Sequence, residues 1–201
     1  MKHGAIILAG GRGERFHGRK QYLELRGKPL WKRVSDKAAL ALGSDENIVR
    51  VGIDFPGGAT RTDSVKLGLS ALDPRTNRVV IAEAARPLVT VGQLKRLLID
   101  SAPSSAYVMP LVNTVVMRDG SYVDRDEMYE LLTPQAFDFH KLVSAYDTGK
   151  YADMTDETRV MFEEYGIKAH FIETGDNLVK VTYPRDVAVI EGILQGREDL
   201  L

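Results

Sequence analysis

The stretch Ala5-Ile6-Ile7-Leu8-Ala9-Gly10-Gly11-Arg12-Gly13-Glu14-Arg15 joins a short apolar run to a glycine-rich segment near the start of the chain. The run at residues 5–8 is continuously apolar, which is typical of a strand buried on both faces of a parallel sheet. The glycines predict a turn at the carboxyl end of that strand. Ligands of open α/β sheets bind at the carboxyl ends of the strands, so this turn is the first candidate for a binding site.

The composition of the turn suits a phosphate. Gly10, Gly11 and Gly13 lack a Cβ atom and can bring backbone N–H groups close to an anion. Arg15 and Lys20 supply positive charge, which suits a triphosphate whose charge rises during transfer. The alternative is a glycine turn followed by a solvated basic loop. The segment lacks both the Gly-Lys-Ser/Thr ending of a P-loop and the third glycine of a Rossmann fingerprint.

The overall composition is that of a globular protein. The chain has 201 residues, of which 44% are hydrophobic and 27% charged, and its net charge is −1. We therefore expect no general attraction to nucleic acid or membranes, and no apolar run is long enough for a membrane span. The absence of cysteine excludes disulfides, thiolate catalysis and zinc–sulfur sites. The first strand leaves no room for a signal peptide, so we expect a cytoplasmic protein.

Apolar runs typical of strands alternate with helical patterns along the chain. This alternation predicts an α/β fold with a mainly parallel sheet and helices on both faces. The length favours a single domain over residues 1–201. We expect strands at 5–8, 47–53, 78–82, 106–111 and 169–172, and helices at 31–42, 61–72, 91–102, 137–146, 155–164 and from Pro184 onward.

The segment at about 113–125 differs from this alternation. Val115-Val116-Met117 and Ser121-Tyr122-Val123 flank Arg118-Asp119-Gly120. An Asp-Gly pair between β-branched runs favours a β-hairpin. A lone two-stranded ribbon is only marginally stable, so we expect this arm to lie on its own domain or on a partner subunit.

Several motifs, taken in order, resemble one enzyme family. The pattern Leu-Ala-Gly-Gly-x-Gly-x-Arg at residues 8–15, with Lys20 downstream, is similar to the opening of sugar and polyol phosphate nucleotidyltransferases. Lys20-Gln21-Tyr22-Leu23 and Gly27-Lys28-Pro29 narrow the resemblance to the family of 2-C-methyl-D-erythritol 4-phosphate cytidylyltransferase and ribitol-5-phosphate cytidylyltransferase. The family implies a Rossmann-like nucleotidyltransferase fold with a mixed sheet. It implies transfer of CMP from CTP to a polyol phosphate, with Mg²⁺ as cofactor and a homodimer joined through the arm.

The resemblance also assigns roles to individual residues. It makes Arg15, Lys20 and Lys180 the catalytic residues that neutralise charge on the reacting phosphates. It implies that the nucleotide contacts Leu8, Ala9, Gly10, Gly11, Gly13, Gly58, Arg61 and Ser64, with Gly58 and Ser64 near the cytosine. It implies that the acceptor contacts Glu83, Arg86, Thr114, Arg125, Thr133, Thr155 and Asp156, and that Glu83 is the metal ligand.

Some of these residues also fit simpler interpretations. Thr155 and Asp156 fit the start of a helix, with an N-cap followed by acidic residues. Glu83 and Arg86 fit an ion pair at a strand end. Arg125 fits an exposed hairpin arginine.

The chain departs from the family pattern at several points. Ala82-Glu83 stands where the family has His-Asp, Asn113 replaces an Asp, and one extra residue separates Asn177 from Lys180. The segment 43–56 is short and supplies one strand where the family has two. Three functions stay open: CMP transfer to methylerythritol or ribitol phosphate, nucleotidyl transfer with a changed acceptor or base, and nucleotide binding without catalysis. Retention of the basic residues argues against the last.

Overall fold

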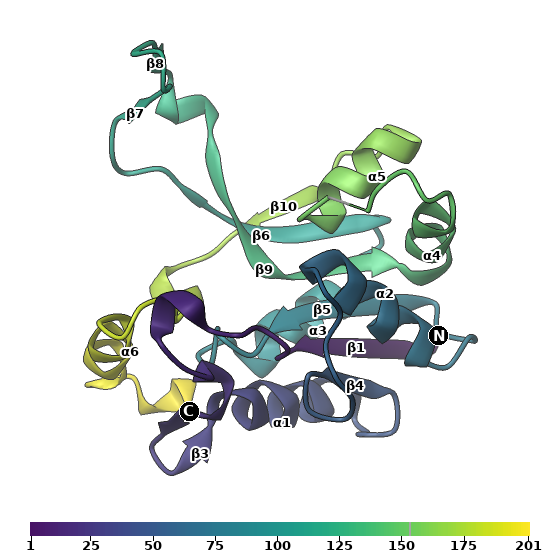
Figure 1. The fold of residues 1–201 in the computed structure, drawn as a ribbon, viewed down its shortest axis with the longest axis horizontal. Coiled ribbons are helices and arrows are strands. Elements are labelled where there is room, and N and C mark those ends of the chain that lie inside the picture. Colours follow the sequence, from purple (N-terminus) through teal and green to yellow (C-terminus); the bar gives the residue numbers. More distant parts are fainter. Residues whose placement is uncertain (153) are drawn as a thin grey trace.

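The computed structural model describes residues 1–152 and 154–201. Its main sheet has six strands in the order β10-β6-β9-β5-β1-β4 (Figure 1). β1 is parallel to β4 and β5, β6 is parallel to β10, and β9 runs antiparallel to both β5 and β6. The strands are β1 (His3–Leu8), β4 (Ile48–Val51), β5 (Arg78–Glu83), β6 (Ser104–Pro110), β9 (Tyr129–Asp138) and β10 (His170–Glu173). This mixed, mainly parallel sheet confirms the predicted fold class.

Helices cover both faces of the sheet (Figure 1). α1 (Leu30–Leu42) and α3 (Val91–Ile99) pack on one face, and α2 (Arg61–Ala71), α4 (Phe139–Asp147) and α5 (Glu157–Tyr165) pack on the other. Successive side chains of a strand point to opposite faces. Ala5 and Ile7 therefore join one buried cluster, whereas Ile6 joins the other. No described helix is long and apolar enough to cross a bilayer.

A third apolar cluster joins the two ends of the chain. Leu25 and Leu30 pack with Ile190 and Leu194 of α6 (Asp186–Leu194). Leu25 belongs to a small ribbon of β2 (Glu24–Leu25) and β3 (Lys28–Pro29). The predicted start of the last helix at Pro184 is wrong, because the backbone turns at residues 183–185 and the helix begins at Asp186. Short 3₁₀ turns occupy Glu14–Phe16, Lys20–Tyr22, Arg125–Glu127, Asp176–Leu178 and Glu198–Leu200.

β1 lies where the order of the strands reverses. The chain passes from β1 to β4 on one side and then to β5 on the other. In open α/β sheets a ligand-binding crevice forms at such a switch point, outside the carboxyl ends of the strands. The glycine segment after Leu8 therefore enters the crevice directly. Glu83, which pairs with Leu8 in the sheet register, ends the neighbouring strand at the same edge.

β9 is a central strand that the sequence analysis did not predict. It contains Pro134, and proline within a run argues against a central strand because it lacks a backbone N–H group. The ladder shifts register here: Gln135 pairs with Ala106, whereas Leu132 pairs with Tyr107. Thr133 and Pro134 therefore lie outside the ladder, and the proline costs no sheet hydrogen bond. The predicted helix from residue 137 begins later, at Phe139.

The predicted hairpin arm extends away from the sheet as a continuation of β6 and β9 (Figure 1). β7 (Val115–Val116) and β8 (Tyr122–Val123) pair antiparallel at its tip. Gly120 adopts a φ of 89° in the intervening turn, which glycine accommodates without steric cost. Val112 and Tyr122 are 79% and 80% exposed. The arm thus presents large apolar side chains to the outside of the chain.

Candidate active site

A cleft of about 660 Å³ opens at the switch point. The glycine segment, the start of α2, the end of β5 and the segment at 180–182 form its walls. The sequence-predicted residues that line it are Leu8, Ala9, Gly10, Gly11, Gly13, Arg15, Lys20, Gly58, Arg61, Ser64, Glu83 and Lys180.

The three glycines after β1 differ in why the structure needs a residue without a side chain there. A Cβ atom on Gly10 would lie 3.0 Å from the Cα atom of Gly57, so close backbone packing requires this glycine. Gly13 has a φ of 68°, and a Cβ atom there would lie 1.8 Å from the carbonyl oxygen of Gly18. Gly11 differs, because among the described residues nothing lies within 4 Å of its Cβ position. The space beside Gly11 is the room that a phosphate needs to approach the backbone.

Three basic side chains reach the cleft from two distant segments. Lys20 donates a hydrogen bond from Nζ to the carbonyl oxygen of Val181 at 2.6 Å, and Lys180 is the preceding residue. Burial and the neighbouring Lys180 charge lower the pKa of Lys20. Arg15 is exposed, and its guanidinium carbon lies 5.9 Å from the ring centre of Tyr183. A bound anion would relieve the repulsion among these cations.

Asp186 fixes the segment that carries Lys180. Its Oδ2 accepts hydrogen bonds from the backbone N–H groups of Thr182 at 2.7 Å and Tyr183 at 2.8 Å. Thr182 lines the cleft, although the sequence analysis gave it no role. The sequence feature that could have identified Thr182 is an aspartate, Asp186, four residues later, which can bind its backbone N–H group. Asn177 instead donates from Nδ2 to the carbonyl oxygen of Leu88 at 3.0 Å and is buried beneath the site.

The start of α2 forms another wall of the cleft. Thr60 caps the helix: its hydroxyl accepts from the N–H group of Asp63, and the Asp63 carboxylate accepts from the N–H group of Thr60, both at 3.0 Å. The Ser64 hydroxyl accepts from the N–H group of Gly58 at 3.1 Å and donates to the carbonyl oxygen of Thr60 at 3.0 Å. Thr60 lines the cleft and was another residue without a predicted role. The stretch therefore caps a helix and also holds the Gly58 backbone at the cleft.

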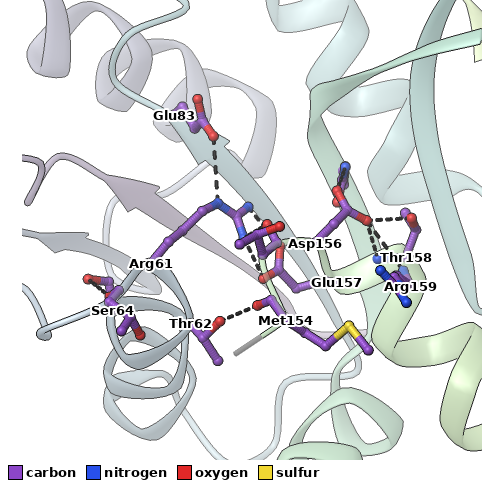
Figure 2. Close-up of polar contacts among 12 residues, drawn as sticks. Arg61, Thr62, Ser64, Glu83, Met154, Asp156, Glu157, Thr158 and Arg159 are labelled. Atoms are coloured by element: carbon purple, nitrogen blue, oxygen red, sulfur yellow. Dashed lines mark hydrogen bonds and ion pairs between the residues drawn. The ribbon is translucent and has the colours of Figure 1, made fainter. Parts of the chain in front are cut away.

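Glu83 lies between two cations. Its Oε2 is 2.5 Å from Lys180 Nζ. Its Oε1 is 3.7 Å from Arg61 Nε, a contact that Figure 2 shows. Burial alone would raise the pKa of Glu83, but the charges of Lys180 and Arg61 hold it below its usual value. The alternative interpretation of Glu83, an ion pair with Arg86, is wrong: Glu83 pairs with Lys180 and Arg61, whereas Arg86 donates from Nε to the hydroxyl of Thr133 at 2.9 Å.

Arg61 is bound end-on by a carboxylate that the sequence analysis missed. Its Nη1 and Nη2 atoms lie 2.7 and 2.8 Å from Oε1 and Oε2 of Glu157 (Figure 2). Nη1 also donates to the carbonyl oxygen of Thr155 at 2.8 Å. Glu157 is 0% exposed, and burial raises its pKa. Its sequence signal was ambiguous, because acidic residues are common in the first turn of a helix.

Several predicted acceptor residues lie outside the cleft lining. Arg86 and Thr133 are buried beside it. Asp156 is the N-cap of α5, where Oδ1 accepts from the N–H group of Thr158 at 2.9 Å; this confirms the capping interpretation (Figure 2). Thr114 and Arg125 are exposed on the arm.

The donor set for a metal ion is small. Among residues 1–152 and 154–201, no group of three or more His, Asp or Glu side chains could hold one. Glu14 and Glu83 are the carboxylates that line the cleft. Magnesium needs only one or two carboxylates when substrate phosphates supply further oxygens. Glu14 and Glu83 therefore fit a cation that is bound jointly by protein carboxylates and nucleotide phosphates. They do not fit a cation that the protein binds alone.

One crevice at the switch point is lined by a glycine loop and by two lysines, Lys20 and Lys180, that are far apart in the sequence. This arrangement is typical of an α/β nucleotidyltransferase. The chain belongs to the 2-C-methyl-D-erythritol 4-phosphate cytidylyltransferase family, whose model matches residues 35–196. Enzymes of this family use a divalent metal ion.

The relatives match over nearly the full chain. The 2-C-methyl-D-erythritol 4-phosphate cytidylyltransferase of Pelotomaculum thermopropionicum is 32% identical, over 100% of this chain and 97% of the relative. The Chromobacterium violaceum enzyme of the same name is 30% identical, over 97% and 99%. The crystal structure of 4-diphosphocytidyl-2C-methyl-D-erythritol synthase from Anaerococcus prevotii superposes with a TM-score of 0.81 at 22% identity, covering 96% of both chains. This structural likeness confirms the fold.

Proposed function

We propose that this protein transfers CMP from CTP to 2-C-methyl-D-erythritol 4-phosphate and releases pyrophosphate. The observation that carries the proposal is the convergence of Lys20, Lys180 and the glycine loop on one cleft. Near full-length relatives named for this activity support the choice of substrates.

The reaction needs no covalent intermediate with the protein. An oxygen of the acceptor phosphate attacks the α-phosphorus of CTP, and the bond to pyrophosphate breaks. Such a step depends on positioning and on neutralising the charge that develops. Arg15, Lys20 and Lys180 would supply the positive charge, while the open side of Gly11 would admit the triphosphate to backbone N–H groups. The hydrogen bond from Lys20 to Val181 keeps the two lysines on one wall.

We propose that Ser64 and the backbone beside Gly58 read the cytosine edge. Ser64 fixes the Gly58 N–H group, so the loop is rigid before a base arrives. A rigid, hydrogen-bonding pocket discriminates between bases because a mismatched base leaves polar groups unpaired. CTP should therefore outcompete UTP and ATP, and equal use of all three would refute this assignment.

We propose Mg²⁺ as the divalent ion and Glu83 as its protein ligand. When bound, the ion would neutralise charge on the phosphates of CTP. Lys180 Nζ lies 2.5 Å from Oε2 of Glu83, and the carboxylate has further lone pairs with which it would hold the ion. Arg86 and Thr133 would then support the wall beneath the acceptor.

We propose a homodimer in which the arm of one subunit completes the acceptor site of the other. Thr114 and Arg125 do not line the cleft of their own chain, although a basic residue suits an acceptor phosphate. Exposed Val112 and Tyr122 give the arm an apolar surface for a partner. Thr155, whose carbonyl oxygen accepts from Arg61, and Asp156 would lie near the same acceptor.

Pyrophosphate release with CTP and a panel of polyol phosphates tests the function. We expect the highest kcat/KM with 2-C-methyl-D-erythritol 4-phosphate. A preference for ribitol 5-phosphate would favour the second candidate, for which the observation is Glu83 in place of a shorter Asp. CTP binding without release from any acceptor would favour a non-catalytic nucleotide-binding protein.

Subunit mixing tests the dimer. Arg125→Ala and Lys20→Ala should each be inactive alone, because each removes one half of every composite site. Mixed dimers carry one site with neither substitution, so mixing should restore part of the activity. A monomer by analytical ultracentrifugation, or no restoration in mixed dimers, would contradict the arrangement.

A further inference from the structure

A chain of interacting polar groups, partly or fully buried, runs from α4 to the cleft, and Figure 2 shows its links among Glu157, Arg61 and Glu83. It begins at Tyr146, whose hydroxyl donates to Oε1 of Glu157 at 3.1 Å. Glu157 binds both terminal nitrogens of Arg61, at 2.7 and 2.8 Å. Arg61 Nε lies 3.7 Å from Oε1 of Glu83, and Oε2 of Glu83 lies 2.5 Å from Lys180 Nζ. Groups from α4, α5, α2 and β5 are thus linked to a basic residue of the cleft.

Most of the hydrogen-bond donors of Arg61 are already used within the described part of the chain. A guanidinium carries its five N–H donors in a rigid plane. Both terminal nitrogens bind Glu157, and Nη1 also donates to the carbonyl oxygen of Thr155. End-on pairing therefore fixes the plane and turns the remaining edge, Nε, towards Glu83. Arg61 lines the cleft but has few donors left for a nucleotide.

The carboxylate that holds Arg61 is itself rigidly placed. Its neighbour Asp156 accepts a hydrogen bond from Gln135 Nε2 at 2.8 Å, which ties the segment to β9. Thr62 donates to the carbonyl oxygen of Met154, which ties the same segment to α2 (Figure 2). A flexible Glu157 would let the guanidinium rotate. These contacts prevent that rotation.

A contribution to folding stability alone does not explain why these polar groups are linked. A buried ion pair gains little over well-packed apolar residues, because removing two charges from water is costly. Here the pair lies against a cleft and contacts a carboxylate that contacts a cleft lysine. Such buried charge networks cluster at functional sites.

We infer that Tyr146, Glu157 and Arg61 form a positioning chain that fixes the carboxylate of Glu83 and, through it, Lys180. Arg61 attracts one oxygen of Glu83 as an ion pair at 3.7 Å, while the other oxygen lies 2.5 Å from Lys180 Nζ. A glutamate has one more rotatable bond than an aspartate, so a fixed cation on one oxygen limits the positions it can take. For its effect on catalysis the inference rests on the proposed function, but the geometry does not.

The test removes both charges of the buried pair together. Arg61→Met combined with Glu157→Gln leaves no unpaired buried charge, so it should fold where either single substitution risks failure. We expect kcat to fall about 10- to 100-fold, as for other supporting residues of an active site, with the KM for CTP unchanged. Tyr146→Phe removes only the outermost link, so its loss of kcat should be smaller. A raised KM with unchanged kcat would overturn the inference, because it would mean that Arg61 binds the nucleotide directly.

Arg78→Met is the matched control. Arg78 is also buried, and it donates to the carbonyl oxygens of Leu97 and Ala102 and to the hydroxyl of Ser105, outside the cleft lining. It should lose stability and keep the kcat of its folded fraction. If kcat fell equally in Arg78→Met and in the double variant, the linked polar groups would serve only to support the structure. That result would refute the inference.

A second measurement needs no turnover. Acylation of lysines by an N-hydroxysuccinimide ester, followed by mass spectrometry, reports how firmly Glu83 shields Lys180. The rate at Lys180 should change several-fold in the folded double variant relative to exposed Lys95, the internal reference. An unchanged Lys180 rate overturns the positioning chain whatever the turnover. If the wild-type enzyme does not use 2-C-methyl-D-erythritol 4-phosphate, the proposed function is refuted. The acylation rate of Lys180 would then still test the positioning chain.

Discussion

Replacing Gly11 by alanine tests whether the glycine loop holds a phosphate. The added Cβ atom meets no described atom within 4 Å, and Gly11 has no positive φ, so the free energy of unfolding should change by less than about 0.5 kcal/mol. The methyl group would occupy the space through which a phosphate approaches the backbone. Losing a hydrogen bond to a charged group costs about 1.5–3 kcal/mol, which corresponds to a fall of about 10- to 100-fold in kcat/KM.

Gly13→Ala is the comparison that separates phosphate contact from backbone strain. Gly13 has a φ of 68°, and its Cβ atom would lie 1.8 Å from Gly18 O, so the loop must rearrange. The left-handed conformation alone costs about 1–2 kcal/mol for a residue with a side chain. Urea unfolding and pyrophosphate release measure both effects. A Gly11→Ala enzyme with full kcat/KM, or one as destabilised as Gly13→Ala, would refute the reasoning.

Other predictions concern charged residues. Lys20→Ala and Arg15→Ala should each lower kcat by at least about 100-fold with little change in Tm, because single charges facing a transition state have effects of this size; near-normal turnover in either variant would contradict the triphosphate assignment. Glu83→Gln should lower turnover and shift its dependence on Mg²⁺ concentration, and an unchanged curve would remove Glu83 from the metal site. Lys37 donates to the carbonyl oxygens of Pro87 and Leu200, and burial lowers its pKa from 10.5 to about 8. Between these values the unfolded chain keeps a proton that the folded chain has released, so the wild type should gain up to about 3 kcal/mol over Lys37→Met from pH 8 to 10.5; parallel pH curves would contradict this.

The sequence predicted the elements whose signal is local. The apolar run at 5–8, the Asp119-Gly120 hairpin turn and the glycine spacing each depend on a few neighbouring residues, and each lies where expected. Ligands bind at the carboxyl ends of parallel strands, which predicted one crevice for Glu83 and Gly11, because they lie at or just beyond the ends of the neighbouring parallel strands β5 and β1.

The parts that were missed depend on distant contacts. β9 was missed because Pro134 argues against a central strand, and only a register shift against β6 accommodates it. Glu157 was missed because its sequence context is that of an ordinary helix start. Its partner Arg61 is 96 residues away, and no local pattern links the two.

The hydrogen bond from Lys20 to Val181 has a consequence for biosynthesis. It joins residues 161 positions apart, and the apolar cluster beneath it joins Leu25 and Leu30 to Ile190 and Leu194. During translation the glycine loop leaves the ribosome long before Val181, whose carbonyl group accepts the hydrogen bond from Lys20. Contacts of such long sequence separation form late, because the loop-closure entropy must be overcome first. The proposed triphosphate site is therefore complete only after residues 180–182 and α6 have docked onto the N-terminal segment.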